Sequence, residues 1–405
     1  MSETLQYPTT TTIVTDAVNA GNVSVTNDLL DQWAYLTPSP VNAPTIIAGL
    51  QRLANTYINN QAGAFWSNAS LAYTTSPVTT LVGGDKFVGG CQVPDGRVVF
   101  APWNVAYIGI YNPNTNTWAT LATSGTGNTV DQYQGCVLAP DGRVIFVPWT
   151  ATAIGTWNPV TNTWATVGGV LPSGGKFCGG TVIPDGRIVF FASGVAYYGF
   201  FNPATNTYTS AIPSGNTVPT GSGHIGGCLY ADGRIIQPPS YNNPNIGIYN
   251  PVTNVYTTFA NARPSNANGE YDQAFMIPDG RVAFIPRGCN PANLGLYDPR
   301  TNTFTTITGP AAGTQWFISG CALPDGRVVC SPAFSSYLLV FNTVNNTYTT
   351  TAGLPAGNAF NGMCMLKDGR ILGMATGSTT LGIFSGFNQG IPAEYVLHPF
   401  FNQNC

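Results

Sequence analysis

The chain has 405 residues, of which 43% are hydrophobic and only 8% are charged, and its net charge at pH 7 is −3. This composition excludes a disordered chain, and the small net charge excludes the strongly basic surface that binds nucleic acids or anionic lipids. The 47 Gly and 31 Pro residues, with no apolar run of about 18 residues, favour short strands joined by turns and exclude insertion into a membrane.

Residues 1–66 precede the repeated part of the chain and are predicted to form an arm. Pro44 stands in the first turn of a predicted helix over residues 44–58, one face of which is apolar. A region so small and so poor in apolar side chains does not fold alone, so we expect it to pack on the rest of the chain or on other copies of it. Because the chain opens without the basic start and apolar stretch of a secretory signal, we expect synthesis in the cytoplasm. The side chains expected to mediate assembly are Ile46, Leu50, Leu53 and Tyr57.

The tripeptide Asp-Gly-Arg recurs seven times, at intervals of 43 to 47 residues. Around each copy, apolar segments alternate with turns, and the third segment leads into a turn such as Asn112-Pro113-Asn114-Thr115-Asn116. Asp-Gly between apolar segments is a hairpin signal, because Gly accepts the positive φ of a tight turn. Repeats of this length with four antiparallel strands are typical of propeller blades, so the sequence predicts an all-β, seven-bladed β-propeller over residues 67–390. The copies begin at Asp95, Asp141, Asp185, Asp232, Asp279, Asp325 and Asp368.

The seventh repeat lacks an outermost strand. In the other six, that strand carries an aromatic residue followed by small β-formers, as in Trp118-Ala119-Thr120, whereas the last repeat ends at Gly386. A matching segment, Tyr73-Thr74-Thr75, lies ahead of the first repeat. We therefore expect a strand over residues 71–76 to complete the last blade, which removes an open sheet edge.

The Asp-Gly-Arg copies contain half of the chain's 14 basic residues. A charged ring that binds anions is one interpretation of this pattern. A turn in which Asp and Arg pair locally is the favoured one, because these segments barely vary between repeats and all emerge on one face of the propeller.

The opposite face is predicted to carry the loops that differ between repeats, and these loops are the candidate binding region. Their aromatic residues, with Asn and Thr neighbours, suit sugar rings or protein partners. The alternative is that they only cover the central opening. The candidate residues are Trp103, Tyr133, Trp149, Tyr241, Tyr271, Arg287, Trp316 and Tyr337.

No arrangement of residues typical of catalysis or metal binding stands out. The sequence has no Cys-x-x-Cys pair, phosphate loop, nucleophile elbow or His-Glu-x-x-His motif. His224 and His398 lie far apart, and Glu270 and Asp272 are expected in a solvated loop. We therefore expect no catalytic residue, no metal, no cofactor and no enzymatic activity. Cysteines recur at one position of the innermost strand, which favours small buried residues, at Cys91, Cys228, Cys321 and Cys364, with Cys136 one residue away.

The repeats resemble the kelch class of propeller repeats over residues 85–386. The resemblance rests on an aromatic residue, Asn or Asp, Pro, turn residues and a second aromatic residue, as in Tyr111-Asn112-Pro113 to Trp118. Kelch-type copper oxidases share the Pro-Asp-Gly-Arg style of blade, and the resemblance to them implies a copper site with two His and Tyr ligands. No set of residues in this chain corresponds to that site.

The chain also resembles propeller proteins of bacteriophages and large viruses. The shared features are runs such as Leu323-Pro324-Asp325-Gly326-Arg327-Val328 and an aromatic-Asn ending, here His398-Pro399-Phe400-Phe401-Asn402, in the predicted tail over residues 391–405. The resemblance implies a non-enzymatic fibre, tail or capsid-decoration subunit on the surface of a virion, which assembles with copies of itself and with other particle subunits. Alternatives are a subunit of a self-assembling extracellular fibre or surface layer, and a lectin that binds surface glycans.

Overall fold

The computed structural model describes residues 72–77 and 86–387, apart from short internal segments. The described residues contain strands β1 to β29 and no helix. The predicted helix over residues 44–58, with its four assembly side chains, and the tail over residues 391–405 lie outside the described residues. The internal segments left out are residues 128–129, 168, 222–223, 241–242, 261–269, 278, 290, 312–316, 324–325, 334, 352–353, 355–359, 367 and 376–379.

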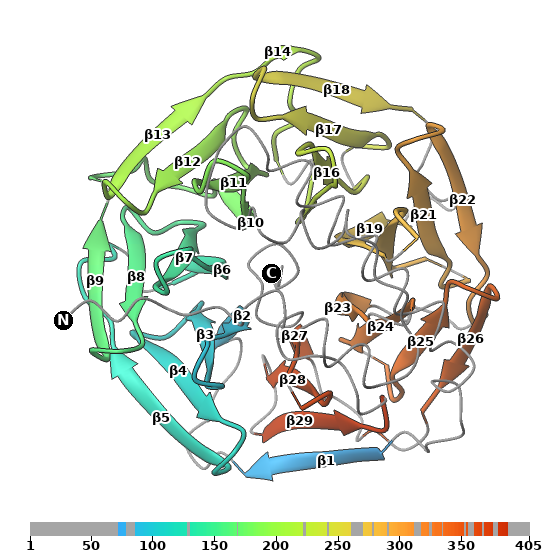
Figure 1. Ribbon diagram of the computed structural model, residues 1–405, viewed down its shortest axis with the longest axis horizontal. Helices are drawn as coiled ribbons and strands as arrows, with labels where there is room; N and C mark the ends of the chain where they lie inside the picture. The colour runs from blue at the N-terminus through green and yellow to red at the C-terminus, as the bar shows by residue number, and fades with distance from the viewer. Residues whose placement is uncertain are drawn as a thin grey trace, which may run out of the picture.

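The strands form seven sheets that stand radially around a central axis (Figure 1). Within each sheet, consecutive strands pair in antiparallel fashion from the innermost strand outward. The prediction of an all-β, seven-bladed propeller with four-stranded antiparallel blades is confirmed. We number the blades 1 to 7, starting with the blade that carries the first Asp-Gly-Arg copy.

Blade 1 contains β2 (Phe87–Gln92), β3 (Val98–Pro102), β4 (Tyr107–Asn112) and β5 (Thr117–Ala122), and blade 2 contains β6 (Tyr133–Leu138), β7 (Val144–Pro148), β8 (Ile154–Asn158) and β9 (Thr163–Val167). Blade 3 contains β10 (Phe177–Val182), β11 (Ile188–Ala192), β12 (Tyr198–Asn202) and β13 (Thr207–Ala211). Blade 4 contains β15 (Cys228–Leu229), β16 (Ile235–Gln237), β17 (Ile246–Asn250) and β18 (Val255–Phe259), with the short β14 (Ser214–Gly215) parallel to β18.

Blade 5 contains β19 (Glu270–Met276), β20 (Val282–Arg287), β21 (Leu294–Asp298) and β22 (Thr303–Ile307). Blade 6 contains β23 (Phe317–Ala322), β24 (Arg327–Pro332), β25 (Leu339–Asn342) and β26 (Thr347–Thr350). Blade 7 contains β27 (Phe360–Met365), β28 (Ile371–Ala375) and β29 (Thr380–Ser385), with β1 (Ala72–Pro77) outermost.

The ring closes because β1 pairs with β29 (Figure 1). The pairing is antiparallel and places Tyr73 opposite Phe384, with ring centroids 5.2 Å apart. The outer strand of blade 7 therefore comes from the segment that the repeat spacing places ahead of the first unit. Closure of this kind covers the edge of β29 with backbone hydrogen bonds.

In the Asp-Gly-Arg turns, the Asp forms an ion pair with the Arg of the same turn. In blade 1, Asp95 accepts hydrogen bonds from the backbone N–H of Arg97 at 2.9 Å and from its guanidinium at 2.6 Å. All six copies whose Asp is described contain this ion pair, which agrees with the favoured interpretation as a local turn. Arg97 Nη2 also donates to the backbone oxygen of Pro159 in blade 2, at 2.6 Å. The Arg side chain therefore joins neighbouring blades as well as closing its own turn.

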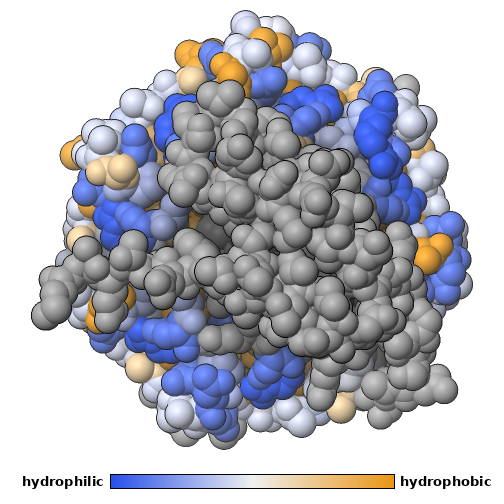
Figure 2. Space-filling view, in the orientation of Figure 1, coloured by the Kyte–Doolittle hydropathy of each residue, from blue (hydrophilic) through white to orange (hydrophobic). Residues whose placement is uncertain are grey.

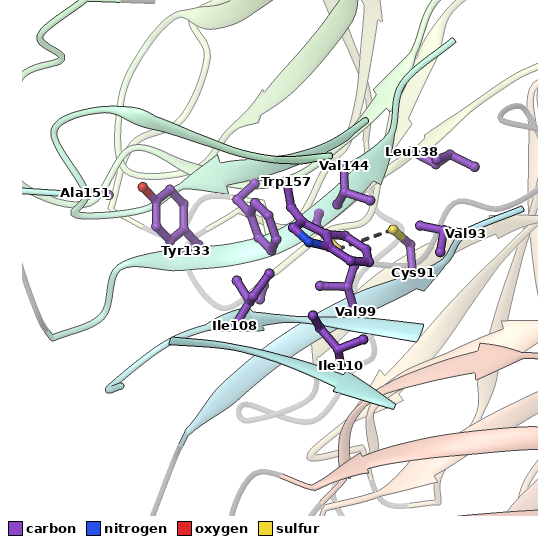
Figure 3. Close-up of a cluster of buried hydrophobic side chains, with 13 residues drawn as sticks. Cys91, Val93, Val99, Ile108, Ile110, Tyr133, Leu138, Val144, Ala151 and Trp157 are labelled. Carbon is purple, nitrogen blue, oxygen red and sulfur yellow. Dashed lines mark hydrogen bonds between the residues drawn. The ribbon is translucent and has the colours of Figure 1, made fainter. Parts of the chain in front are cut away.

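The hydrophobic core lies between neighbouring blades. In Figure 3, side chains from blades 1 and 2 interlock, and the indole of Trp157 fills the middle of the cluster. Within blade 1, the rings of Phe87 and Trp118 pack over Gly109, where a Cβ atom would lie 2.2 Å from the Trp118 ring. In every blade except blade 6, the third strand carries such a Gly, as in the Ile-Gly-Ile of residues 108–110, and it leaves room for a ring from the first or fourth strand.

The outer rim is largely hydrophilic, with hydrophobic residues in small separate groups (Figure 2). Valines at the tips of the Asn-Pro turns, such as Val160 and Val252, are among the exposed hydrophobic residues. Among the described residues, no helix is long and apolar enough to cross a membrane.

Candidate ligand-binding site

The candidate site lies where the first strands of blades 1, 2 and 3 begin. In blades 1, 2 and 3, the residue nine positions ahead of the Asp of the Asp-Gly-Arg turn is a long polar one. It is Lys86 in blade 1, Gln132 in blade 2 and Lys176 in blade 3. All three are buried, with at most 1% of each residue exposed. Because they occupy equivalent positions of adjacent blades, they form a row at one end of the propeller, beside the loops between second and third strands.

Backbone hydrogen bonds fix this row to those loops. The carbonyl oxygen of Lys86 accepts from the N–H of Trp103 at 2.7 Å, and that of Gln132 accepts from the N–H of Trp149 at 2.9 Å. The N–H of Gln132 in turn donates to the carbonyl oxygen of Trp103 at 3.0 Å. Gln132 therefore joins the two tryptophan-bearing loops, and the predicted residues Trp103 and Trp149 lie in adjacent parts of one site.

The two tryptophans are partly exposed. The ring of Trp149 lies over the backbone of Gly175, since a Cβ atom there would come within 2.5 Å of Trp149 Cζ2. Gly175 directly precedes Lys176, so an aromatic face and a lysine share this part of blades 2 and 3.

Lys176 is an incompletely satisfied cation. Among the described residues, its ammonium donates one hydrogen bond, to the carbonyl oxygen of Gly174 at 2.9 Å, and has no carboxylate within ion-pair distance. An ammonium has three donors, so two remain for another acceptor. Burial disfavours the charged form and lowers the pKa of Lys176 from 10.5 to about 8.

The side chain of Gln132 adds an acceptor without a donor. Its Nε2 donates to the carbonyl oxygen of Val105 at 2.6 Å, whereas its Oε1 is buried and has no hydrogen-bond partner among the described residues. A buried amide oxygen in this state costs about 1–3 kcal/mol, and a ligand that donates a hydrogen bond to it recovers part of that cost.

Two other predicted residues, Tyr133 and Tyr271, belong to the core. Both are fully buried, and both occupy the position eight residues ahead of the Asp of their repeat. Phe87 has the same position in blade 1, where it packs on the aromatic residue of the fourth strand. Tyr133 packs in the same way on Trp164, and Tyr271 on Phe304. These tyrosines therefore offer no exposed ring to a ligand.

The remaining predicted residues lie away from this row. Arg287 in blade 5 is half-buried and forms a 3.4 Å ion pair with Asp272, which is 4% exposed. The expectation that Glu270 and Asp272 lie in a loop is wrong, because both belong to β19, and Asp272 is buried rather than solvated. Tyr337 in blade 6 is partly exposed and packs on Phe317. The other two predicted residues, Tyr241 and Trp316, lie outside the described residues.

His224 takes the core aromatic position in blade 4. Its Nδ1 lies 2.7 Å from the carbonyl oxygen of Pro238, so Nδ1 carries the proton and Nε2 accepts from the hydroxyl of Tyr256, also at 2.7 Å. Complete burial lowers the pKa of His224 to about 4. A neutral, enclosed imidazole of this kind replaces the packed ring of the other blades. Among the described residues, no group of three or more His, Cys, Asp or Glu side chains could hold a metal ion.

The residues that sequence reasoning missed are Lys86, Gln132 and Lys176. The signal that could have found them is their shared position in the repeat, together with the rarity of lysine, which occurs only three times in the chain. Two of those three lysines stand at this one position.

No family model matches the chain, and no curated protein matches its sequence. Solved propellers do match its structure. A streptogramin B lyase aligns with a TM-score of 0.66 at 15% identity, over 79% of this chain and 99% of the lyase. A catalytically inactive histidine variant of virginiamycin B lyase from Staphylococcus aureus, solved with quinupristin, aligns with a TM-score of 0.65 at 15% identity, over 78% and 99% of the two chains. The extracellular domain of a hybrid two-component system from B. thetaiotaomicron aligns with a TM-score of 0.59 at 11% identity, over 77% of this chain and 40% of that one.

These likenesses establish the fold and correct two expectations. The interpretation of the chain as a structural subunit of a virion, with a fibre subunit or a lectin as alternatives, is contradicted, because the similar propellers named above are lyases and the extracellular domain of a two-component system. The expectation that the chain is not an enzyme is contradicted as well, since the lyases share its fold. The physical reason is that the repeats specify how blades fold, whereas function depends on the residues that the loops place on them.

Proposed function

We propose that this chain is a ligand-binding propeller whose site lies across blades 1 to 3 and takes a small carboxylate that carries a ring. The observation that carries the proposal is Lys176, a buried ammonium that uses one of its three donors and has no carboxylate partner among the described residues. A lysine buried in this way destabilises the free protein. A bound carboxylate accepts the two remaining hydrogen bonds and compensates the charge.

The second component of the site is aromatic. Trp149 lies against the segment that leads into Lys176, and Gln132 joins its loop to that of Trp103. A ring that stacks on an indole while its carboxylate reaches the ammonium fits this combination. Gln132 Oε1 suits a hydroxyl or N–H donor of the same ligand.

An ammonium that binds a carboxylate and an indole that stacks on a ring accept an aromatic acid and a sugar acid alike. Benzoate and glucuronate are therefore the probes, with benzyl alcohol and glucose as their uncharged counterparts. Similarity to the extracellular domain of a two-component system supports a place of action outside the cytoplasm as part of the proposal.

Isothermal titration of the full chain at pH 7 tests the proposal. We expect one of the two carboxylates to bind while its uncharged counterpart binds at least about 10-fold more weakly, the difference expected for a charge-assisted hydrogen bond. Lys176→Met and Trp149→Ala should each weaken binding. The matched controls are Arg300→Met, whose side chain is 56% exposed, and Tyr348→Ala, on an outer strand. Binding that Lys176→Met leaves unchanged contradicts the proposal.

A further inference from the structure

The innermost strands of blades 1 and 2 bring two thiols into contact. Cys91 on β2 and Cys136 on β6 lie with their sulfur atoms 3.5 Å apart, although 45 residues separate them in the chain. The dashed line in Figure 3 ends on the sulfur of Cys91, which belongs to the core cluster between these two blades. Both residues are buried, and neither is part of a disulfide.

We propose that Cys91 and Cys136 are an oxidative cross-linking site, which joins blades 1 and 2 through a disulfide when the protein meets a peroxide. A disulfide requires a sulfur separation of about 2 Å, so the two sulfurs have to approach by about 1.5 Å from their 3.5 Å contact. The inference is independent of the proposed ligand, because neither thiol belongs to the row of Lys86, Gln132 and Lys176.

The reaction balances with hydrogen peroxide as the oxidant. One sulfur, as its thiolate, attacks a peroxide oxygen; the O–O bond breaks, and a sulfenic acid and one water result. The second sulfur then attacks the sulfenic sulfur, the S–S bond forms, and a second water leaves. The two sulfurs lose two electrons in total, the peroxide gains them, and the protein loses two hydrogen atoms.

Position in the repeat does not by itself give such a pair. Cys91, Cys228, Cys321 and Cys364 occupy the same position in different blades, and a pair forms in blades 1 and 2 because Cys136 is displaced by one residue along its strand. Cys364 in blade 7 interacts electrostatically with Cys91 and is the competing partner. The thiol of Cys364 donates instead to the backbone oxygen of Met365, at 3.6 Å, whereas the thiol of Cys136 donates to the sulfur of Cys91.

The test is treatment of the full chain with hydrogen peroxide, followed by titration of thiols in denaturant and by peptide mapping without reductant. Of the chain's nine cysteines, seven should remain titratable, and one disulfide-linked peptide should contain Cys91 and Cys136. A linked peptide that joins Cys91 to Cys364, or a count of nine with both thiols intact, overturns the proposal.

Variants make the test sharper. Peroxide should raise the midpoint of thermal unfolding of the unsubstituted chain by roughly 5 °C, because the cross-link closes a long loop in the unfolded state. Cys91→Ala and Cys136→Ala should each lose this rise and keep the remaining thiols. Cys228→Ala is the matched control, since Cys228 is equally buried at the same repeat position, and it should keep the rise. A rise that survives in Cys136→Ala contradicts the assignment.

Discussion

Replacing Lys176 by Met should stabilise the protein while it abolishes ligand binding. Met has nearly the same length as the lysine side chain and has no charge to desolvate. Burial lowers the pKa of Lys176 from 10.5 to about 8, which means that folding disfavours its charged form. A lysine that only maintained the structure would behave in the opposite way, because its removal would cost stability.

The expected change in the free energy of unfolding follows from the pKa shift of Lys176. Each pKa unit corresponds to about 1.4 kcal/mol, so the buried ammonium costs at most about 3 kcal/mol at pH 7. Screening by water in this loop region reduces the figure, and Met leaves the carbonyl oxygen of Gly174 without its 2.9 Å hydrogen bond, which costs about 1 kcal/mol. We therefore expect Lys176→Met to raise the free energy of unfolding by about 1 kcal/mol at pH 7.

The dependence on pH separates this effect from a general change in packing. Between pH 8 and pH 10.5 the unfolded chain holds the Lys176 proton and the folded chain does not, so the stability of the unsubstituted protein should rise with pH across this interval. The difference from Lys176→Met should shrink over the same interval. Urea denaturation followed by tryptophan fluorescence measures both, with Arg300→Met as the control. A variant that is less stable than the parent at pH 7, with the same pH dependence, would refute the reasoning.

Two further substitutions test the core. Gly109→Ala places a Cβ atom 2.2 Å from the ring of Trp118, so it should destabilise the protein by about 1–3 kcal/mol in urea denaturation, and an unchanged midpoint would show that the ring moves freely. His224→Phe restores the ring that the other blades carry. Because the pKa of His224 is about 4 in the folded protein against 6.5 when exposed, the parent should lose about 3 kcal/mol as pH falls from 6.5 to 4, and the variant should lose less. Equal losses in parent and variant would mean that His224 stays solvated.

Much of the fold could be predicted from the repeats. The Asp-Gly-Arg spacing gives the number of blades, because each hairpin turn has to recur once per sheet. The Ile-Gly-Ile pattern gives the third strand, although its steric reason becomes clear only when the rings of Phe87 and Trp118 are seen over Gly109.

The site was harder to predict, because exposure depends on packing between blades that a single repeat does not contain. In the sequence, Tyr133 and Tyr271 look like loop residues between repeats, whereas the structure places them in β6 and β19. An aromatic ring at their position in nearly every repeat marks a core position. Lys176 looks like an ordinary surface cation in the sequence. The structure shows it buried, directly after Gly175, against which Trp149 of the neighbouring blade packs. Comparing the residues at equivalent positions of the repeats identifies both the core tyrosines and the buried lysine, whereas the type of each residue taken alone does not.

Proton uptake on ligand binding tests the role of Lys176 most directly. Titration calorimetry at pH 9, in two buffers with different ionisation enthalpies, counts the protons that accompany binding of the carboxylate identified by the probes. A carboxylate bound to Lys176 raises the pKa of its ammonium from about 8, so binding should take up about one proton per ligand at pH 9 and almost none at pH 6. Binding at pH 9 without proton uptake, or with uptake that persists in Lys176→Met, would show that the ligand is held elsewhere.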